Sequence, residues 1–140
     1  MKGVYVLFSH APYEFSLKIS DENVTFKQGY YAYVGSALGG IEKRVGRHFS
    51  NEKKLHWHID HFLLHAKAVD VIAANTDERM ECKVADGMAK VFQAVRGFGA
   101  SDCNCESHLF YSKDLHDVLQ GAIKVFKEMG LKVERGVSYE

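Results

Sequence analysis

Two short glycine–tyrosine motifs and a basic segment carry the side chains that could do chemistry in this chain. Gly3-Val4-Tyr5 lies near the start, and Tyr33-Val34-Gly35 precedes a segment that bears Arg44 and His48. Arg44 and His48 are four residues apart, so in a helix they share one face. A guanidinium can bind phosphate oxygens through two N–H groups, and phenol and imidazole groups can donate or accept protons. Together these side chains could bind a phosphate and move a proton.

The segment around Arg44 is the densest positive stretch of the sequence. Between Ile41 and Lys54 there are five basic and two acidic residues, in a chain whose 18 basic and 18 acidic residues cancel. A phosphate backbone would bind at such a local excess of positive charge. The alternative is an ordinary solvated helix surface, and the overall neutrality excludes a globally cationic nucleic-acid binder. The expected nucleic-acid contacts are Lys43, Arg47, Lys53, Lys54 and His58.

Histidines and cysteines form two further groups. His58, His61 and His65 are spaced close to one helical face, where neutral imidazoles could hold a transition metal. We expect a hydrogen-bonded or solvated histidine face instead, because no carboxylate or cysteine completes a metal site at a familiar spacing.

The cysteine loop is the second group. Cys103, Cys105 and His108 do not have zinc-finger spacing, and Cys82 would have to come from a distant helix as a fourth ligand. We therefore expect buried thiols and loop hydrogen bonds, with this loop and the histidine face bordering an active cleft. A structural zinc site is the alternative.

The elements that must position these side chains follow from hydrophobic periodicity. Strands are predicted at Val4–Phe8, Phe15–Ile19, a return strand from Val24, Tyr30–Val34, Val69–Ala74 and Leu109–Tyr111. Helices are predicted at Ile41–Phe49, Trp57–Ala66, from the Thr76-Asp77 cap to Gly97, and from Asp114 to Gly130. This order predicts an α+β fold, with a small mixed or antiparallel sheet flanked by helices.

Length and composition set the frame for these elements. With 140 residues, 46% hydrophobic and 26% charged, residues 1–140 are expected to form a single domain. No apolar run approaches the ~20 residues of a membrane span, and the first residues lack a signal-peptide cleavage region. We therefore expect a cytoplasmic protein without membrane contact, and three cysteines argue against a disulfide framework.

The two glycine–tyrosine motifs, followed by a helical arginine, resemble the GIY-YIG nuclease superfamily. Its pattern matches Gly3–Tyr5, Tyr33–Gly35 and Arg44. The stretches His56-Trp57-His58-Ile59-Asp60 and Gly97–His108 resemble signatures of an uncharacterised, largely archaeal branch, some of whose members are fused to endonuclease III-like DNA glycosylases. The resemblance extends from about Gly3 to Tyr111 and implies a GIY-YIG-like fold.

This resemblance implies a metal-dependent endonuclease that hydrolyses DNA phosphodiester bonds, with a role in DNA repair. By analogy, Tyr33 would deprotonate the attacking water, with its pKa lowered by Arg44, while Tyr5 and His48 would orient water and phosphate. Glu81, on the long helix predicted after Thr76-Asp77, would hold Mg²⁺ or Mn²⁺. The implied partners are DNA and an endonuclease III-like glycosylase. Further active-site candidates are Gly35, Asn104, Ser107 and His108.

One departure from the family bears on geometry. The interval from Tyr5 to Tyr33 is longer than in typical members, and the extra length fits a hairpin around Asp21–Asn23. A one-residue slip in strand pairing would turn Tyr33 to the other face of the sheet.

Two alternative functions stay open. A non-catalytic nucleic-acid-binding module would need Arg44, Arg47 and the lysines, but neither Tyr33 nor Glu81. A zinc-stabilised interaction domain is the third hypothesis.

Overall fold

The computed structural model describes residues 1–37, 39–50, 55, 57–99 and 104–136. Within these residues the fold is α+β, as the sequence predicts. The central sheet runs in the order β6 (Gln93–Ala94), β7 (Leu109–Ser112), β4 (Gly29–Ala37), β1 (Gly3–Ala11), β5 (Lys67–Asn75) and β8 (Glu134–Arg135). All of its described pairings are antiparallel.

β1 lies at the centre because its sequence is apolar on both faces. Its side chains are almost all buried, and β4 and β5 pair with it along nearly its full length. Tyr5 and Leu7 point to one face, which also carries Tyr31 and Tyr33 and is called here the tyrosine face. Alternate residues such as Val6 point to the opposite face.

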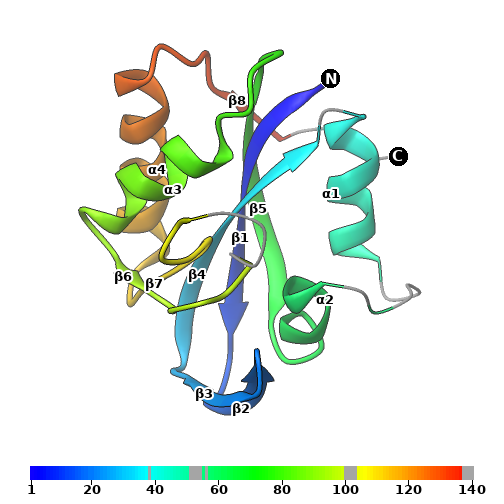
Figure 1. Ribbon diagram of the computed structural model, residues 1–140, viewed down its shortest axis with the longest axis vertical. Helices are drawn as coiled ribbons and strands as arrows, with labels where there is room; N and C mark the ends of the chain where they lie inside the picture. Colours follow the sequence, from blue (N-terminus) through cyan, green and yellow to red (C-terminus); the bar gives the residue numbers. More distant parts are fainter. Residues whose placement is uncertain (38, 51–54, 56, 100–103, 137–140) are drawn as a thin grey trace.

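Different elements cover the two faces (Figure 1). α1 (Ile41–Phe49), α2 (His58–Phe62) and the hairpin of β2 (Phe15–Ile19) and β3 (Glu22–Phe26) contribute apolar side chains to the tyrosine face. α3 (Glu81–Ala89) and α4 (Leu115–Glu128) pack on the opposite face. The sheet therefore separates two layers of core.

The best-predicted elements have clear start and stop signals. α1 has the predicted bounds, with Ile41 and Val45 buried. α4 begins after Asp114, buries its predicted apolar stripe and ends before Gly130, whose φ of 73° suits glycine. The predicted β2–β3 hairpin also forms, but its turn lies at Ser20 and Asp21, and β3 begins at Glu22 and not at Val24.

Two predicted helices differ from the structure. α2 ends at Phe62, and the chain continues in turns to Ala66. The helix predicted from the Thr76-Asp77 cap to Gly97 is shorter in the structure: α3 begins at Glu81 and ends at Ala89, and β6 then pairs with β7 at the sheet edge. Strand pairing here overrides the helical spacing, which leaves Val91 67% exposed. No helix in the described part of the chain is both long and apolar enough to span a membrane.

Candidate functional site

The pairing of β1 with β4 brings the two motif tyrosines together. Tyr5 pairs with Gly35, and Leu7 pairs with Tyr33, so both tyrosines point to the same face. Their ring centroids are 6.4 Å apart. A Cβ atom at Gly35 would overlap the Tyr5 ring, so the glycine makes room for the tyrosine. The β2–β3 insertion therefore leaves the register intact.

His48 reaches this pair from α1. It follows Ile41 and Val45 on the buried stripe of the helix, which places its ring against the sheet. Tyr5 Oη and His48 Nε2 form a buried hydrogen bond of 2.7 Å, and the His48 ring centroid is 5.9 Å from that of Tyr33. We call Tyr5, Tyr33 and His48 the tyrosine–histidine cluster.

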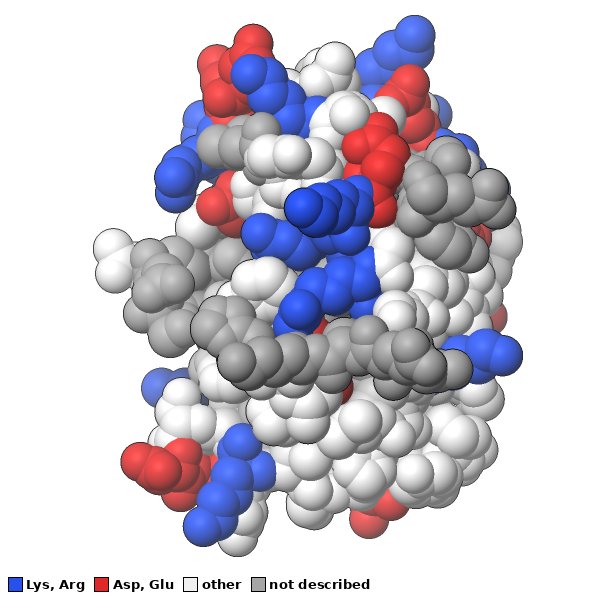
Figure 2. Space-filling model, turned by 90° about the vertical axis from the view of Figure 1, so that its right-hand side faces the viewer, with Lys and Arg blue, Asp and Glu red and all other residues white. Residues whose placement is uncertain are grey.

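A cationic pocket is connected to the cluster through Arg44, which lines the pocket and whose charge acts on both Tyr5 and Tyr33. It has a volume of about 350 Å³, and Lys43, Arg44, Arg47 and Trp57 contribute to its lining. The Arg44 and Arg47 guanidinium carbons lie 4.5 and 4.7 Å from the Trp57 ring centroid, within cation–π range. Lys and Arg side chains gather in the middle of the molecular face that carries α1 (Figure 2). Lys53 and Lys54 lie outside the described residues.

Asp60 joins α2 to this pocket, and sequence reasoning did not assign it a role. Its side chain is fully buried, and Oδ2 accepts hydrogen bonds from Arg47 at 2.6 Å and from the Trp57 backbone N–H at 2.8 Å. An acidic residue three positions after the residue that precedes a helix is a capping signal, which could have identified it.

Burial controls the ionisation of the two tyrosines. The pKa of Tyr33 is raised to about 12, and burial is the largest cause. The charge of Arg44 lowers this pKa and the charge of Asp60 raises it, but both effects are smaller than that of burial. Burial also raises the pKa of Tyr5 well above its usual value. The expectation that Arg44 would bring the Tyr33 pKa below its usual value was therefore wrong, because desolvation outweighs the cation. At neutral pH Tyr33 is a neutral hydrogen-bond donor.

The structure does not bring Glu81 into the tyrosine–histidine cluster. Glu81 begins α3, which packs on the opposite face of the sheet, and its carboxylate influences the pKa of His108. Its buried Oε2 atom has no hydrogen-bond partner in the described part of the chain, which suits a cation ligand. The carboxylate that influences both tyrosines is Asp60. Glu81 is therefore not placed to hold a metal ion at the cluster.

The expected histidine face divides into different environments. His58 accepts a hydrogen bond at Nδ1 from the Gly99 N–H, at 3.0 Å, and its ring packs near Phe98. Burial lowers the pKa of His58, with a further lowering by His61. Phe98 also contacts the Tyr33 ring, so His58 borders the cluster. His65 instead stacks on Phe15, away from this border.

The candidates before β7 have different surroundings. The Ser107 hydroxyl is buried and exchanges hydrogen bonds with the Leu109 backbone, which gives it a local structural role. Asn104 is exposed. His108 Nδ1 contacts the Val34 carbonyl at 3.2 Å, and burial lowers its pKa.

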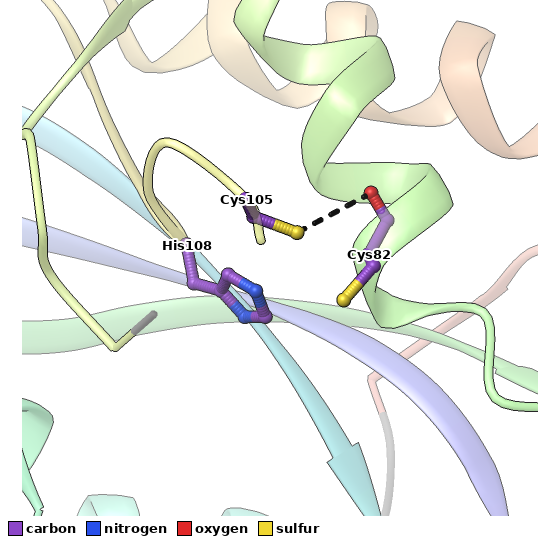
Figure 3. Close-up of side chains that lie close together, drawn as sticks. All are labelled: Cys82, Cys105 and His108. Carbon is purple, nitrogen blue, oxygen red and sulfur yellow. Dashed lines mark hydrogen bonds between the residues drawn. The ribbon is translucent and has the colours of Figure 1, made fainter. Parts of the chain in front are cut away.

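The cysteines have an arrangement that their spacing did not predict. Cys82, although distant in sequence, lies beside Cys105 and His108, with their candidate ligand atoms all within 4.8 Å of one another (Figure 3). Cys103 lies outside the described residues.

The site residues described above all lie within a segment that matches a known family model. A family model described as "Domain of unknown function DUF123" matches residues 4–131. The chain belongs to the DUF123 family. No curated protein and no solved structure matches it. The DUF123 match spans the tyrosine–histidine cluster, the cationic pocket and the Cys82, Cys105 and His108 group.

Proposed function

We propose that this protein is a nuclease that hydrolyses DNA phosphodiester bonds, with the phosphate bound in the cationic pocket. The observation that carries the proposal is the meeting of Tyr5, Tyr33, His48 and Arg44 on one face of the sheet. Two strands and a helix supply these side chains, and Tyr5 and His48 are 43 positions apart in the chain. A core packed for stability alone has no need for a histidine and an arginine beside one buried and one partly buried phenol.

The pocket supplies the charge for phosphate binding. Lys43, Arg44 and Arg47 bring three cations to one opening, and Trp57 supports the two guanidinium planes. Arginine forks bind phosphate oxygens with two parallel hydrogen bonds. Charge that develops on the phosphoryl oxygens during hydrolysis would be stabilised by the same groups.

Tyr33 contributes as a neutral donor. It is partly exposed, whereas Tyr5 is fully buried behind it. A bound phosphate adds negative charge beside Tyr33 and therefore favours the neutral phenol further. Tyr33 would donate a hydrogen bond to a phosphate oxygen or to the attacking water, while the Tyr5–His48 hydrogen bond fixes the cluster behind it.

The resemblance implies Mg²⁺ or Mn²⁺ as the catalytic ion, and such an ion would stabilise charge on the phosphate. Because Glu81 lies outside the cluster, the proposal rests on the cluster and the pocket, and the ion is varied in the assay. Participation in DNA repair, an endonuclease III-like glycosylase partner and a cytoplasmic location are part of the proposal on the resemblance alone.

A second function, DNA binding without cleavage, is favoured by one observation. The raised pKa of Tyr33 leaves no phenolate to act as a base near neutral pH. Binding would need only the pocket cations.

The first prediction separates the two functions by plasmid nicking and DNA binding, measured with Mg²⁺, Mn²⁺ or chelator. The nuclease proposal expects nicking with metal and a loss of about 100-fold in Tyr33→Phe, with binding retained, because one transition-state hydrogen bond is removed. Tyr30→Phe is the matched control, since Tyr30 lies on the same strand and its ring packs against His10 instead. Glu81→Gln tests separately whether Glu81 holds the metal ion.

Binding is followed by fluorescence anisotropy on duplex, flapped and branched DNA. Arg44→Ala should weaken binding and reduce the log–log salt slope by about 0.9 for each phosphate that Arg44 neutralises in the wild type. If the protein binds DNA in a salt-dependent way but cleaves no substrate, the nuclease proposal fails and the DNA-binding module is supported. Absence of both would refute both functions.

A further inference from the structure

The arrangement of Cys82, Cys105 and His108 has the geometry of a metal site. We propose that these three residues bind a zinc ion, on the side of the sheet away from the cationic pocket. This inference does not depend on the nuclease proposal. It replaces the sequence-based expectation that the cysteines are only buried thiols.

The distances are close to those of a tetrahedral centre. The candidate ligand atoms of the three residues lie within 4.8 Å of one another. Zinc bonds of about 2.3 Å to sulfur and about 2.0–2.1 Å to nitrogen place neighbouring ligands about 3.5–3.8 Å apart. A movement of the ligand atoms by about 1 Å would therefore bring all three within bonding distance of one zinc ion. The fourth position of the tetrahedron would be taken by water.

The orientation of His108 also suits a ligand. Its Nδ1 lies 3.2 Å from the Val34 carbonyl oxygen, so Nδ1–H donates to that backbone group. This hydrogen bond assigns Nε2 as the ring nitrogen that can hold a metal. Histidine ligands in metalloproteins are commonly fixed by such a bond from the second nitrogen.

Two separate elements supply the sulfur atoms. Cys82 lies in the first turn of α3, and Cys105 lies in the loop before β7. The Cys105 thiol already donates a weak hydrogen bond to the Cys82 carbonyl oxygen, at 3.9 Å (Figure 3). Both cysteines are half-buried, so an ion can enter from solvent and then be partly shielded from it.

The ligand chemistry selects the ion. Two thiolates and one imidazole favour zinc over Mg²⁺ or Ca²⁺, which prefer oxygen ligands. The second candidate group in the described residues, Asp114, His116 and Asp117, is exposed and has no sulfur. It therefore provides the comparison site for an experiment.

A bound zinc ion would connect α3 to the loop that approaches Tyr33. The same loop carries Gly99, where an added Cβ would contact both His108 and the Tyr33 ring. Metal binding is therefore expected to stabilise the fold, because the ion binds the folded arrangement and not the separated ligands.

The test uses reduced, full-length protein that has been freed of metal with a chelator. Zinc titration against a chromophoric competitor should give one equivalent, and the thermal midpoint should rise with zinc. Cobalt(II) in place of zinc should give the intense thiolate-to-cobalt charge-transfer absorption, which requires sulfur ligands. An absent thiolate band would overturn the proposal.

Variants assign the ligands. Cys82→Ser and Cys105→Ser should each lower zinc affinity by about 100-fold or more, since removal of even an outer partner costs 10–100-fold. His116→Ala is the matched control and should bind as the wild type does. Far-UV circular dichroism without metal shows whether each variant folds. Wild-type affinity in Cys82→Ser, or a thiolate band that disappears only in Cys103→Ser, would assign the metal elsewhere and refute the site.

Discussion

Tyr5 occupies space that a side chain at position 35 would otherwise fill. The two residues are cross-strand partners, and the phenol ring crosses over the glycine on its way to His48. Packing against Tyr5 therefore explains the glycine at position 35, whereas the two tyrosines are candidates for chemistry. A small residue at 35 is what allows the Tyr5–His48 hydrogen bond to form.

A second prediction follows for Gly35→Ala. The added methyl group would overlap the Tyr5 ring, and overpacking of this kind costs about 1–3 kcal/mol of unfolding free energy. Gly39→Ala is the control, because nothing lies within 4 Å of a Cβ there, and its effect should stay within about 0.5 kcal/mol. Urea denaturation of both variants measures the difference. Equal stability of the two would contradict the steric role of Gly35.

The sequence predicted which residues meet in the site, but it did not predict how they ionise. The two glycine–tyrosine motifs and the helix after them brought Tyr5, Tyr33, Arg44 and His48 into one hypothesis, and the strand register places both tyrosines on one face. The pKa of Tyr33 depends on how much water reaches it, and this depends on residues such as Phe98 that are distant in the chain. Sequence spacing carries no information about that solvation.

At the scale of elements, one ion pair connects α1 with α2. Arg47 on α1 holds Asp60 on α2, whose carboxylate also accepts the Trp57 N–H. The Asp60 side chain is fully buried and that of Arg47 is 27% exposed, so the pair is shielded on one side only. Arg47, which lines the cationic pocket, is therefore held by a buried carboxylate of α2.

The third prediction compares two cations of that pocket. Arg47→Ala leaves a buried carboxylate without its guanidinium and should cost about 3 kcal/mol of unfolding free energy. Lys43 is exposed on the same helix, so Lys43→Ala should change stability by no more than about 0.5 kcal/mol. Both variants should weaken DNA binding.

Chemical denaturation and anisotropy on the same samples make the comparison. Stability of Arg47→Ala equal to that of Lys43→Ala would show that the buried pair contributes little.

The elements that the sequence missed are the short edge strands. β6 and β8 have two residues each, and their pairing partners lie on β7 and β5. Two residues contain no periodicity, so only the partner strand defines them. Long, well-bounded elements such as α4 were predictable because local signals at both ends agree with the apolar stripe between them.

On the scale of the whole molecule, three tyrosines of the core make the fold sensitive to alkaline pH. Burial raises the pKa values of Tyr5, Tyr31 and Tyr33 above those of an unfolded chain. Well below about pH 10 all three are neutral in both states, and the full stability is present. Above that pH the unfolded chain loses phenolic protons that the folded protein retains, so the free energy of unfolding falls.

The fourth prediction is therefore a loss of stability between about pH 10 and 12, of about 1.4 kcal/mol per pH unit for each such tyrosine. Tyr33→Phe should flatten this dependence by the share of one tyrosine. Tyr13→Phe, at a side chain that is 51% exposed, is the control. Urea titrations across this range measure the slope. An unchanged slope in Tyr33→Phe would be evidence against its raised pKa.

The central place of β1 also affects how the chain is made. Both of its neighbours come later in the sequence: β4 ends at Ala37 and β5 ends at Asn75. During synthesis, β1 therefore lacks one of its two partners until residue 75 has left the ribosome. Unpaired, uncharged β-forming segments are where nascent chains aggregate or recruit chaperones. A pause in translation before residue 75 would leave this strand exposed for longer, so the yield of folded protein would depend on how fast the first half is translated.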